Sequence, residues 1–265
     1  NNLYKDSNYE LKYTILADTE SKICGENPCI WPSRNNILDN LKKLRNSESK
    51  LFIMHYSGHG TSQTDWDGDE DDLKDEVICP YDYSSAGCIK DDILNSEFLQ
   101  HLKSDCFVRI LMDCCRSGTI WDLKYKYGNN IIDTNSGAPN IACNVIVLSG
   151  CKDNQYSYDV YTAGESQGAF SYCFLKTMNQ NSNKNSLTVE NMIKQINNNL
   201  ISGGWSGQTS TLTSSYKIKT NCQFFNFKII NGEEIASINI NEVNTTQQGI
   251  ETSFFSEIFS ICTIS

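Results

Sequence analysis

The stretch RILMDCCRSGTIWD, from Arg109 to Asp122, joins the end of an apolar strand to a polar turn. Val108 to Met112 predicts a buried strand, and Asp113, two adjacent cysteines and a Ser-Gly pair follow it. A cysteine at a strand end leaves the core while the sheet holds its backbone. This arrangement is typical of a catalytic cysteine whose thiol is exposed to a substrate.

A second stretch has the same design. LFIMHYSGHG at 51–60 predicts another strand, which ends in His59 and Gly60. If the two strands are parallel neighbours, their carboxyl ends meet at one edge of the sheet. His59 and Cys115 would then converge as base and nucleophile.

Composition limits the classes of function. The chain has 265 residues, 39% hydrophobic and 20% charged, which suits a packed core of one large or two small domains. The formal charge of −10 argues against nucleic acid or an anionic membrane as the main partner. The sequence contains no apolar run of about 18 residues, so no membrane span is predicted. Most of the 12 cysteines lie in strand-like runs, which favours free thiols and a cytoplasmic location.

Apolar strands alternate with helical patterns along the chain, which predicts an α/β fold with a largely parallel sheet. Strands are expected at 9–18, 50–57, 107–113 and 143–150 and within 216–230, helices at 35–45, 91–103, 168–179 and 189–200, loops at 61–79 and 124–139, and a Ser/Thr-rich segment at 209–215. Functional loops gather at the carboxyl ends of parallel strands. Asp18, His59, Asp113 and Gly150 all fall at such ends.

Three histidines compete for the role of base. His59 follows its strand and lies between two glycines, so its ring can reach a cleft. His55 lies inside the strand and is expected to be structural, and His101 is expected on a helix surface. His59 is therefore the predicted base.

Strand alternation separates the two cysteines. Asp113 and Cys115 share one face, and Cys114 packs on the other. Cys115 is therefore the predicted nucleophile. The backbone N–H groups of Cys115 and Gly60 are candidate donors to an oxyanion.

A carboxylate two residues from a catalytic thiol disfavours the thiolate unless a cation lies between them. The positive side chain of a substrate Lys or Arg would supply that cation. Asp113 then predicts a basic-residue pocket, with Asp18 as a second carboxylate and Ser57 as a lining residue. An ordinary turn role for Asp18 remains open.

The acidic segment 65–76 invites a calcium interpretation. It fails as an EF-hand, because Glu70 stands where that loop requires Gly. The residues alone favour a solvated acidic loop. A calcium site made of separated carboxylates from this segment, Asp91, Asp92 and Asp122 stays open.

Three motifs together closely resemble the metacaspases, a family of caspase-like cysteine peptidases. They are HYSGHG at 55–60, DGDEDDLKDEVICP at 67–80 and DCCRSGTIWDL at 113–123, with weaker matches at 148–155 and 168–178. The resemblance runs from about Asp18 to Ser215 and is closest to the type I group. It implies a caspase-like fold, in which a mostly parallel β-sheet is sandwiched between α-helices.

The resemblance also implies an activity. It is that of a calcium-activated cysteine endopeptidase that cleaves protein substrates after Arg or Lys, acts as a monomer and processes itself. The candidate positions for self-cleavage are Lys124, Lys126 and a site before residue 1. The family dyad falls on His59 and Cys115, the basic-residue pocket on Asp18, Ser57 and Asp113, and the calcium ligands on Asp75, Asp91, Asp92 and Asp122. A metal at Asp122 would order the turn that positions Cys115. The alternative is a catalytically silent, calcium-responsive scaffold on the same fold.

Three departures from the family pattern accompany the resemblance. Arg116 stands where the family usually has His, and Gln208-Thr209-Ser210 stands where it has Gln-Thr-Pro. The family's first strand and helix are expected to have no counterpart here. We expect a peptidase domain at 1–230, with a p20-like part at about 1–135 and a p10-like part at about 140–230. A C-terminal extension is expected at 231–265.

Overall fold

The computed structural model describes most of the chain between residues 12 and 225. The described ranges are 12–18, 29–64, 74–127, 132–162, 165–181, 187–218, 222–225, 229–230 and 233–234. The predicted extension at 231–265 therefore lies outside the described residues, apart from 233–234.

The helices are α1 (Arg34–Arg45), α2 (Tyr83–Ala86), α3 (Asp91–Glu97), α4 (Ala169–Gln180) and α5 (Val189–Ser202), with a 3-10 turn at Leu99–His101. The strands are β1 (Leu51–Ser57), β2 (Gly60–Thr64), β3 (Lys74–Ile78), β4 (Ile89–Lys90), β5 (Phe107–Asp113), β6 (Tyr125–Tyr127), β7 (Ile132–Thr134), β8 (Asn144–Ser149), β9 (Asp159–Thr162), β10 (Glu165–Gly168), β11 (Thr211–Ser214), β12 (Ile229–Ile230) and β13 (Glu233–Glu234).

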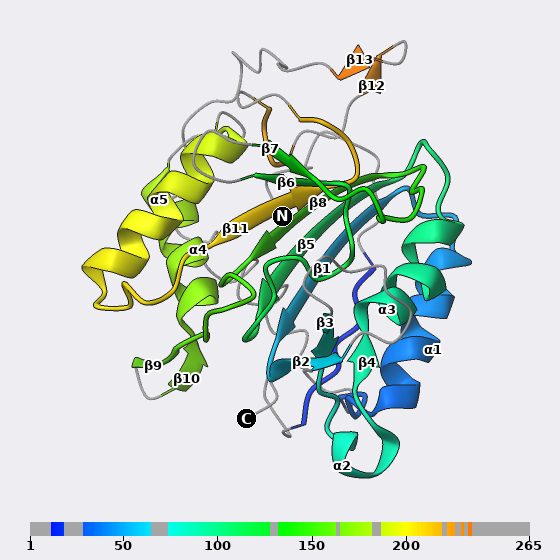
Figure 1. Ribbon diagram of the computed structural model, residues 1–265, viewed down its shortest axis with the longest axis horizontal. Coiled ribbons are helices and arrows are strands. Elements are labelled where there is room, and N and C mark those ends of the chain that lie inside the picture. Colours follow the sequence, from blue (N-terminus) through cyan, green and yellow to red (C-terminus); the bar gives the residue numbers. More distant parts are fainter. Residues whose placement is uncertain are drawn as a thin grey trace.

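A six-stranded sheet forms the centre, in the order β1-β5-β8-β11-β6-β7 (Figure 1). β1, β5 and β8 are parallel neighbours. β11 is antiparallel to both β8 and β6, so β6 runs in the direction of β8. Most strands of this sheet share one direction, and the predicted α/β class is confirmed. A three-stranded sheet, β2-β3-β4, stands beside it.

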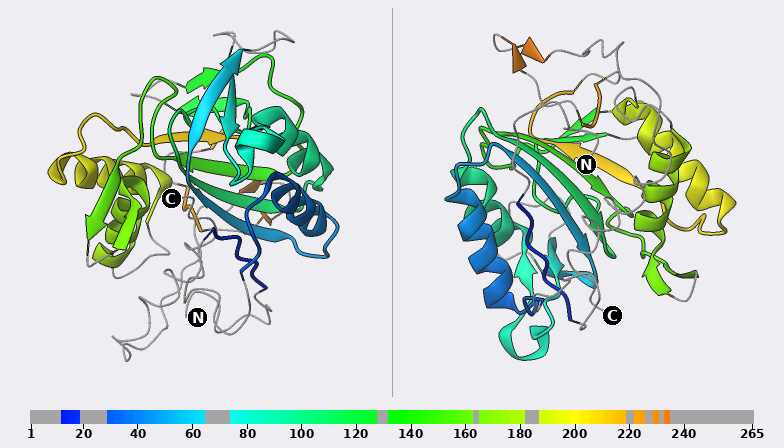
Figure 2. Two further views of the ribbon diagram at one scale, coloured as in Figure 1. Left: turned by 90° about the horizontal axis from the view of Figure 1, so that it is seen from below. Right: turned by 180° about the vertical axis from the view of Figure 1, so that it is seen from behind.

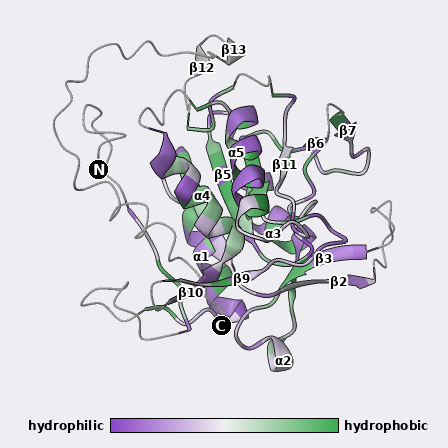
Figure 3. Cartoon of the chain, turned by 90° about the vertical axis from the view of Figure 1, so that its left-hand side faces the viewer, coloured by the Kyte–Doolittle hydropathy of each residue, from purple (hydrophilic) through white to green (hydrophobic). Residues whose placement is uncertain are grey.

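Helices cover both faces of the central sheet (Figures 1 and 2). Side chains of β5 alternate between the two faces, as strand geometry requires. Val108 and Ile110 pack with α1 and α3, whereas Leu111 packs with α4 and α5. β8 alternates in the same way, with Val147 in the first core and Leu148 in the second. Both strands are buried on both faces, so they are largely apolar, as Figure 3 shows for β5. The exception in the middle of β5 is Arg109, which is fully buried and donates hydrogen bonds to the carbonyls of Phe224, Val108 and Asn144.

Local signals fix where the helices begin. The Ser33 side chain accepts a hydrogen bond from the Asn36 N–H at the start of α1, and Thr188 caps α5 in the same way through Asn191. α4 begins directly after Gly168. The predicted helices at 35–45, 168–179 and 189–200 are confirmed within a few residues.

Other sequence expectations were wrong. The segment 61–79 was predicted to be a loop, yet its described parts form most of the β2–β3 hairpin. Backbone pairing stabilises these strands although their side chains are largely polar. The predicted helix 91–103 ends at Glu97, because Phe98 leaves helical geometry and buries its ring.

Short strands account for most of the remaining differences. Of the strands expected within 216–230, the described residues contain only the two-residue β12 and one bridge at Gln223. The predicted loop 124–139 contains β6 and β7, and the Ser/Thr-rich segment 209–215 contains β11. The described part of the predicted strand 9–18 makes only one bridge, from Leu16 to Ile30.

Within the described residues, no helix combines the length and the apolar character needed to span a membrane. Nine described cysteines are free thiols, whereas Cys29 is in a disulfide. The expectation of free thiols therefore holds for nine of the ten described cysteines.

Phe98→Ala tests the first core. The ring is fully buried and makes edge contacts with Phe52 and Trp121, at centroid distances of 5.4 and 6.4 Å. Its removal leaves a cavity, so we expect the free energy of unfolding to fall by about 3–5 kcal/mol in urea titrations. Tyr161→Ala, at a side chain 78% exposed, should change it by less than about 0.5 kcal/mol. Equal losses in both variants would contradict this role of Phe98.

Candidate active site

The register of two parallel strands brings the predicted site residues together. β1 pairs with β5 so that Ser57 lies opposite Asp113, and the Gly58 N–H donates to the Asp113 carbonyl at 3.1 Å. The turns after the two strands touch as well. A Cβ atom built on Gly60 would lie 2.4 Å from the Cys115 carbonyl oxygen. Only a glycine allows the residue after His59 to approach Cys115 so closely.

The two cysteines differ in their surroundings. Cys115 is half-buried, and its Sγ accepts a hydrogen bond from the Ser157 N–H at 3.3 Å. Cys114 is 1% exposed, and this burial raises the pKa of its thiol well above the ordinary value. Cys114 therefore stays protonated in the core, and Cys115 is the more accessible thiol of the pair.

His59 has an exposed side chain on a fixed backbone. Its carbonyl oxygen accepts hydrogen bonds from the Tyr56 hydroxyl at 2.8 Å and from the Cys79 N–H at 3.0 Å. His55, by contrast, is buried, and its Nε2 lies 2.9 Å from the Ser171 hydroxyl. His101 is exposed in the 3-10 turn. His55 is buried and His101 is exposed, as expected, although His101 lies in a 3-10 turn and not in the predicted helix. The role of His59 as the base stays a prediction.

The Asp113 carboxylate lies at the start of α4. The Ser171 N–H donates to one of its oxygens at 2.7 Å, and the Ser157 hydroxyl donates to the other at 2.7 Å. Gly168 leaves room for the carboxylate, because a Cβ atom there would overlap it. Asp113 is 3% exposed, and this burial raises its pKa although both hydrogen bonds lower it.

The turn after Cys115 is held from several sides. The Thr119 N–H donates to Asp153 at 2.8 Å, and the Thr119 hydroxyl donates to Glu76 of β3 at 2.8 Å. The Asn95 side chain of α3 donates to the Trp121 carbonyl at 2.6 Å. The turn is also strained. Its non-glycine residues with positive φ are Arg116 at 53°, Trp121 at 84° and Asp122 at 47°.

Three of the four predicted calcium ligands form one cluster. Oxygen atoms of Asp75, Asp91 and Asp92 lie within 4.8 Å of one another, and Asp122 is not part of this group. Asp75 and Asp91 are each 1% exposed. The Lys90 ammonium group contacts the Asp75 carboxylate. Carboxylate oxygens this close together are a donor set that suits a hard cation with oxygen ligands.

Asp18, the third predicted pocket residue, is partly buried at the end of the described segment 12–18. Sequence reasoning missed Ser157, which bonds both Cys115 and Asp113. The Gln208 side chain bonds the Ser157 hydroxyl at 3.3 Å and the Tyr158 N–H at 3.0 Å. No pattern around Ser157 indicates these contacts, because they arise only when the loop after β8 folds over the end of β5.

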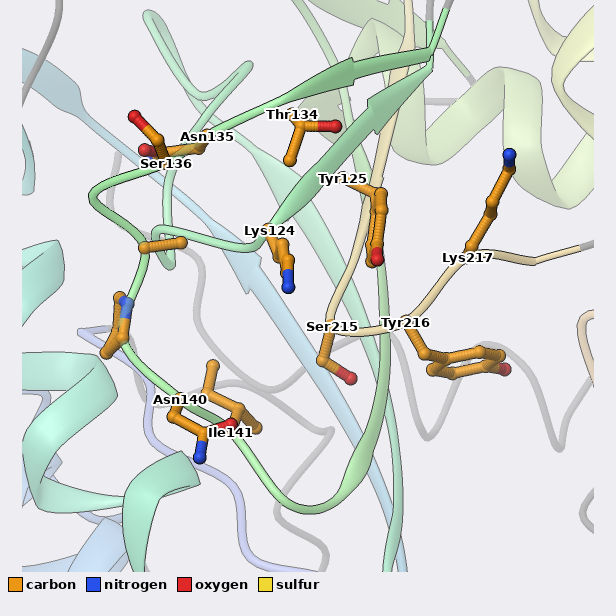
Figure 4. Close-up of a pocket in the computed structure, with 12 residues that line it drawn as sticks. Lys124, Tyr125, Thr134, Asn135, Ser136, Asn140, Ile141, Ser215, Tyr216 and Lys217 are labelled. Atoms are coloured by element: carbon orange, nitrogen blue, oxygen red, sulfur yellow. The ribbon is translucent and has the colours of Figure 1, made fainter. Parts of the chain in front are cut away.

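A separate cavity of about 580 Å³ is lined by residues other than His59, Cys115 and Asp113 (Figure 4). Its lining comes from the β6–β7 hairpin, the segment 138–141 and residues 215–217. The Ser215 N–H bonds the carbonyl of Val145, at the amino end of β8. Cys115 follows the carboxyl end of the neighbouring strand β5, so this cavity is at the opposite end of the sheet.

Asp113→Asn should change how stability depends on pH. The unfolded carboxyl titrates near ~3.9, whereas the folded one keeps its proton to a higher pH. As the pH rises from about 4 through that raised pKa, the folded state binds more protons than the unfolded state. The wild-type free energy of unfolding should therefore fall relative to the variant. Urea titrations of both proteins between about pH 4 and pH 7 measure this difference, and a constant difference would contradict the raised pKa.

Comparisons with known proteins identify the family of the chain. The family model described as "Metacaspase, peptidase C14 domain" matches residues 1–124. Metacaspase-1 of Lodderomyces elongisporus is 33% identical over an alignment length of 252 residues. The match covers 73% of this chain and 55% of the relative. Metacaspase-1 of Candida albicans is 32% identical with the same coverage, and Metacaspase-1 of Cryptococcus neoformans is 31% identical over 75% of this chain and 53% of its own length. The chain thus spans about half the length of these relatives.

A solved structure supports the fold. A protein from Geobacter sulfurreducens superposes with a TM-score of 0.50 and 22% identity, over 71% of this chain and 75% of the other. At that identity the likeness concerns the fold alone. The sequence matches and the α/β architecture together show that the chain belongs to the metacaspase family.

Proposed function

We propose that this chain is a cysteine endopeptidase whose catalytic dyad is His59 and Cys115. The observation that carries the proposal is the close approach of the two turns after β1 and β5, where a Cβ on Gly60 would overlap the Cys115 carbonyl. Membership of a peptidase family supports the class of reaction. The Ser157 N–H at 3.3 Å from Cys115 Sγ would stabilise negative charge on that sulfur.

The proposed reaction is acyl transfer through the thiol. His59 takes the proton of Cys115, and the sulfur attacks the carbonyl carbon of the scissile peptide bond. The tetrahedral intermediate collapses when the C–N bond breaks, and His59 donates the proton to the leaving amine. Water, activated by the same histidine, then hydrolyses the thioester and restores the thiol.

The Gly60 N–H is the proposed donor to the oxyanion, together with that of Cys115. The Cys79 N–H donates to the His59 carbonyl, so this pair, one residue beyond the ends of β2 and β3, is hydrogen-bonded. Hydrogen-bonded and non-bonded pairs alternate along antiparallel strands, and the next pair is Gly60 with Ile78. The Gly60 N–H then points away from β3. This direction supports the proposal that the Gly60 N–H donates a hydrogen bond to the oxyanion of the substrate.

The proposed specificity is for Arg or Lys before the scissile bond. Ser57 and Asp113 stand side by side in the β1–β5 register, and Asp18 is the proposed second carboxylate. Asp113 already accepts two hydrogen bonds and is buried. A substrate guanidinium would therefore replace the Ser157 hydroxyl as its partner, and a charge-assisted bond would favour that exchange.

Calcium is the proposed regulator, held by Asp75, Asp91 and Asp92. When bound, the ion would neutralise the clustered carboxylates and displace Lys90 from Asp75. Two hydrogen bonds connect this region to the turn after Cys115, one from Asn95 to the Trp121 carbonyl and one from Thr119 to Glu76. Asp122 lies in that turn, and its role as a fourth ligand is part of the proposal.

Self-processing is proposed at Lys124 in preference to Lys126. Lys126 lies in β6, where it pairs with β11, and its ammonium group bonds Asp153 at 2.8 Å. Lys124 precedes the strand and is exposed. A peptidase needs an accessible, extended segment, so the exposed residue is the better substrate.

A fluorogenic peptide assay tests the peptidase proposal. With millimolar calcium the wild-type chain should cleave a peptide with Arg before the reporter and leave the matched Asp peptide intact. Cys115→Ala should reduce kcat/KM by at least about 10⁴-fold, because the nucleophile is lost. Cys88→Ala is the matched control, a partly buried cysteine outside the dyad, and should retain activity under reducing conditions. Turnover that is identical in Cys115→Ala, or none by the wild-type chain, would refute the proposal and favour a non-catalytic scaffold.

Calcium binding can be measured without any substrate. In calorimetric titrations Asp75→Asn should weaken calcium binding by about 10-fold or more, because a charged ligand is removed. Lys90→Gln should strengthen it about 3- to 10-fold, since the competing ammonium group is gone. Lys50→Gln, which breaks an exposed ion pair with Asp105, should have no effect. Weaker binding in Lys90→Gln would refute the assignment of the ion to this cluster.

A further inference from the structure

Two cysteines beside the His59 backbone face each other across a pair of strands. β3 and β4 are antiparallel, with Val77 opposite Lys90 and Ile78 opposite Ile89. One step further along the same register, Cys79 stands opposite Cys88. Their Sγ atoms are 3.5 Å apart, and both are free thiols.

We propose that Cys79 and Cys88 form a reversible cross-strand disulfide, a modification site that fixes the strand end to which the His59 carbonyl is bonded. The bond would form by exchange with a small disulfide, such as oxidised glutathione. Its formation does not depend on the proposed peptidase function. Only its influence on catalysis rests on the role of His59.

The geometry requires little movement. Opposite residues of antiparallel strands have Cβ atoms about 4.5–5.5 Å apart, close to the separation of about 3.5–4.5 Å that a disulfide needs. The sulfur atoms would approach from 3.5 Å to about 2.05 Å. Rotation of the two side chains and a small shift of one backbone supply that difference.

Cys88 is the partner expected to move, because its carbonyl accepts only a long hydrogen bond among the described residues, from the Arg34 Nε at 3.4 Å. It is partly buried, it follows Gly87 with φ of 79°, and it precedes a strand of two residues. Cys79 is held more firmly, since its N–H bonds the His59 carbonyl and its own carbonyl accepts from Tyr56 at 3.2 Å. Closure of the bond would therefore bring Cys88 to Cys79 and leave His59 in place.

The two thiols have different roles in the exchange. Burial, followed by the hydrogen bond with Cys88, raises the pKa of Cys79 to about 12, so this thiol reacts poorly with a reagent in solution. The more accessible Cys88 loses its proton and attacks the small disulfide, which releases one small thiolate. Cys79 sulfur then attacks Cys88 sulfur, and the second small thiol leaves.

Atoms and electrons balance in this exchange. The two protein thiols lose two electrons and two protons, and the small disulfide becomes two thiols. A reducing thiol reverses both steps. The product closes a ring from residue 79 to residue 88 that contains α2, and it limits the unfolded states that this segment can adopt.

The test uses the full chain in the Cys115→Ala background, so that the candidate nucleophile cannot react. Protein is equilibrated with oxidised glutathione, remaining thiols are alkylated, and peptides are mapped by mass spectrometry. We expect a linked peptide pair that contains Cys79 and Cys88. We also expect the unfolding midpoint to rise by about 5 °C and to return on reduction with dithiothreitol.

Matched variants distinguish this bond from general oxidation. Cys88→Ser should abolish both the linked peptides and the rise in midpoint, whereas Cys106→Ser, at another free thiol, should retain both. Alkylation of Cys79 and Cys88 as free thiols after oxidation, or an equal rise in Cys88→Ser, would overturn the proposal. No readout uses peptidase activity, so failure here is distinct from failure of the proposed function.

Discussion

The arrangement of the candidate site depends on the parallel pairing of β1 with β5. That register sets Ser57 opposite Asp113, and the hydrogen bond from Gly58 to the Asp113 carbonyl extends the pairing beyond the strands. The turns that carry His59 and Cys115 are then neighbours without any direct bond between their side chains. A shift by one residue would turn Asp113 toward the opposite core, because side chains alternate between faces. The two apolar cores, which bury β5 on both sides, prevent that shift.

Around this register, polar contacts hold the site where hydrophobic packing ends. Ser157 bonds Cys115 and Asp113, and Thr119 connects the turn to Asp153 and Glu76. These contacts oppose the strain of three non-glycine residues with positive φ in the same turn. A turn that is strained and held by a few polar contacts can respond to charge nearby. This property would give a physical basis for the proposed coupling between the carboxylate cluster on β3 and α3 and the turn that carries Cys115.

Much of the fold could be predicted from apolar periodicity, and the failures share one cause. β1, β5, β8 and the three longer helices have strong patterns, because each is packed against a core. The sequence patterns did not predict five short strands that are rich in polar residues, namely β2, β3, β6, β7 and β11. Backbone pairing with a neighbouring strand stabilises them, and the sequence of one strand does not reveal its partner. Phe98 ended a predicted helix for a related reason, because its ring is buried against Phe52 and Trp121.

The sequence by itself determined which residue types stand at the strand ends. The glycines around His59, the separation of Cys114 from Cys115 and the alternation of β5 all follow from local geometry. The tertiary structure alone decided the contacts between segments distant in the chain. Burial of Asp113 under α4, the bond from Ser157 to Cys115, the clustering of Asp75 with Asp91 and Asp92, and the approach of Cys79 to Cys88 are of this kind. These contacts join segments that are distant in the sequence. The spacing of residues along the chain does not show which of those segments pack together.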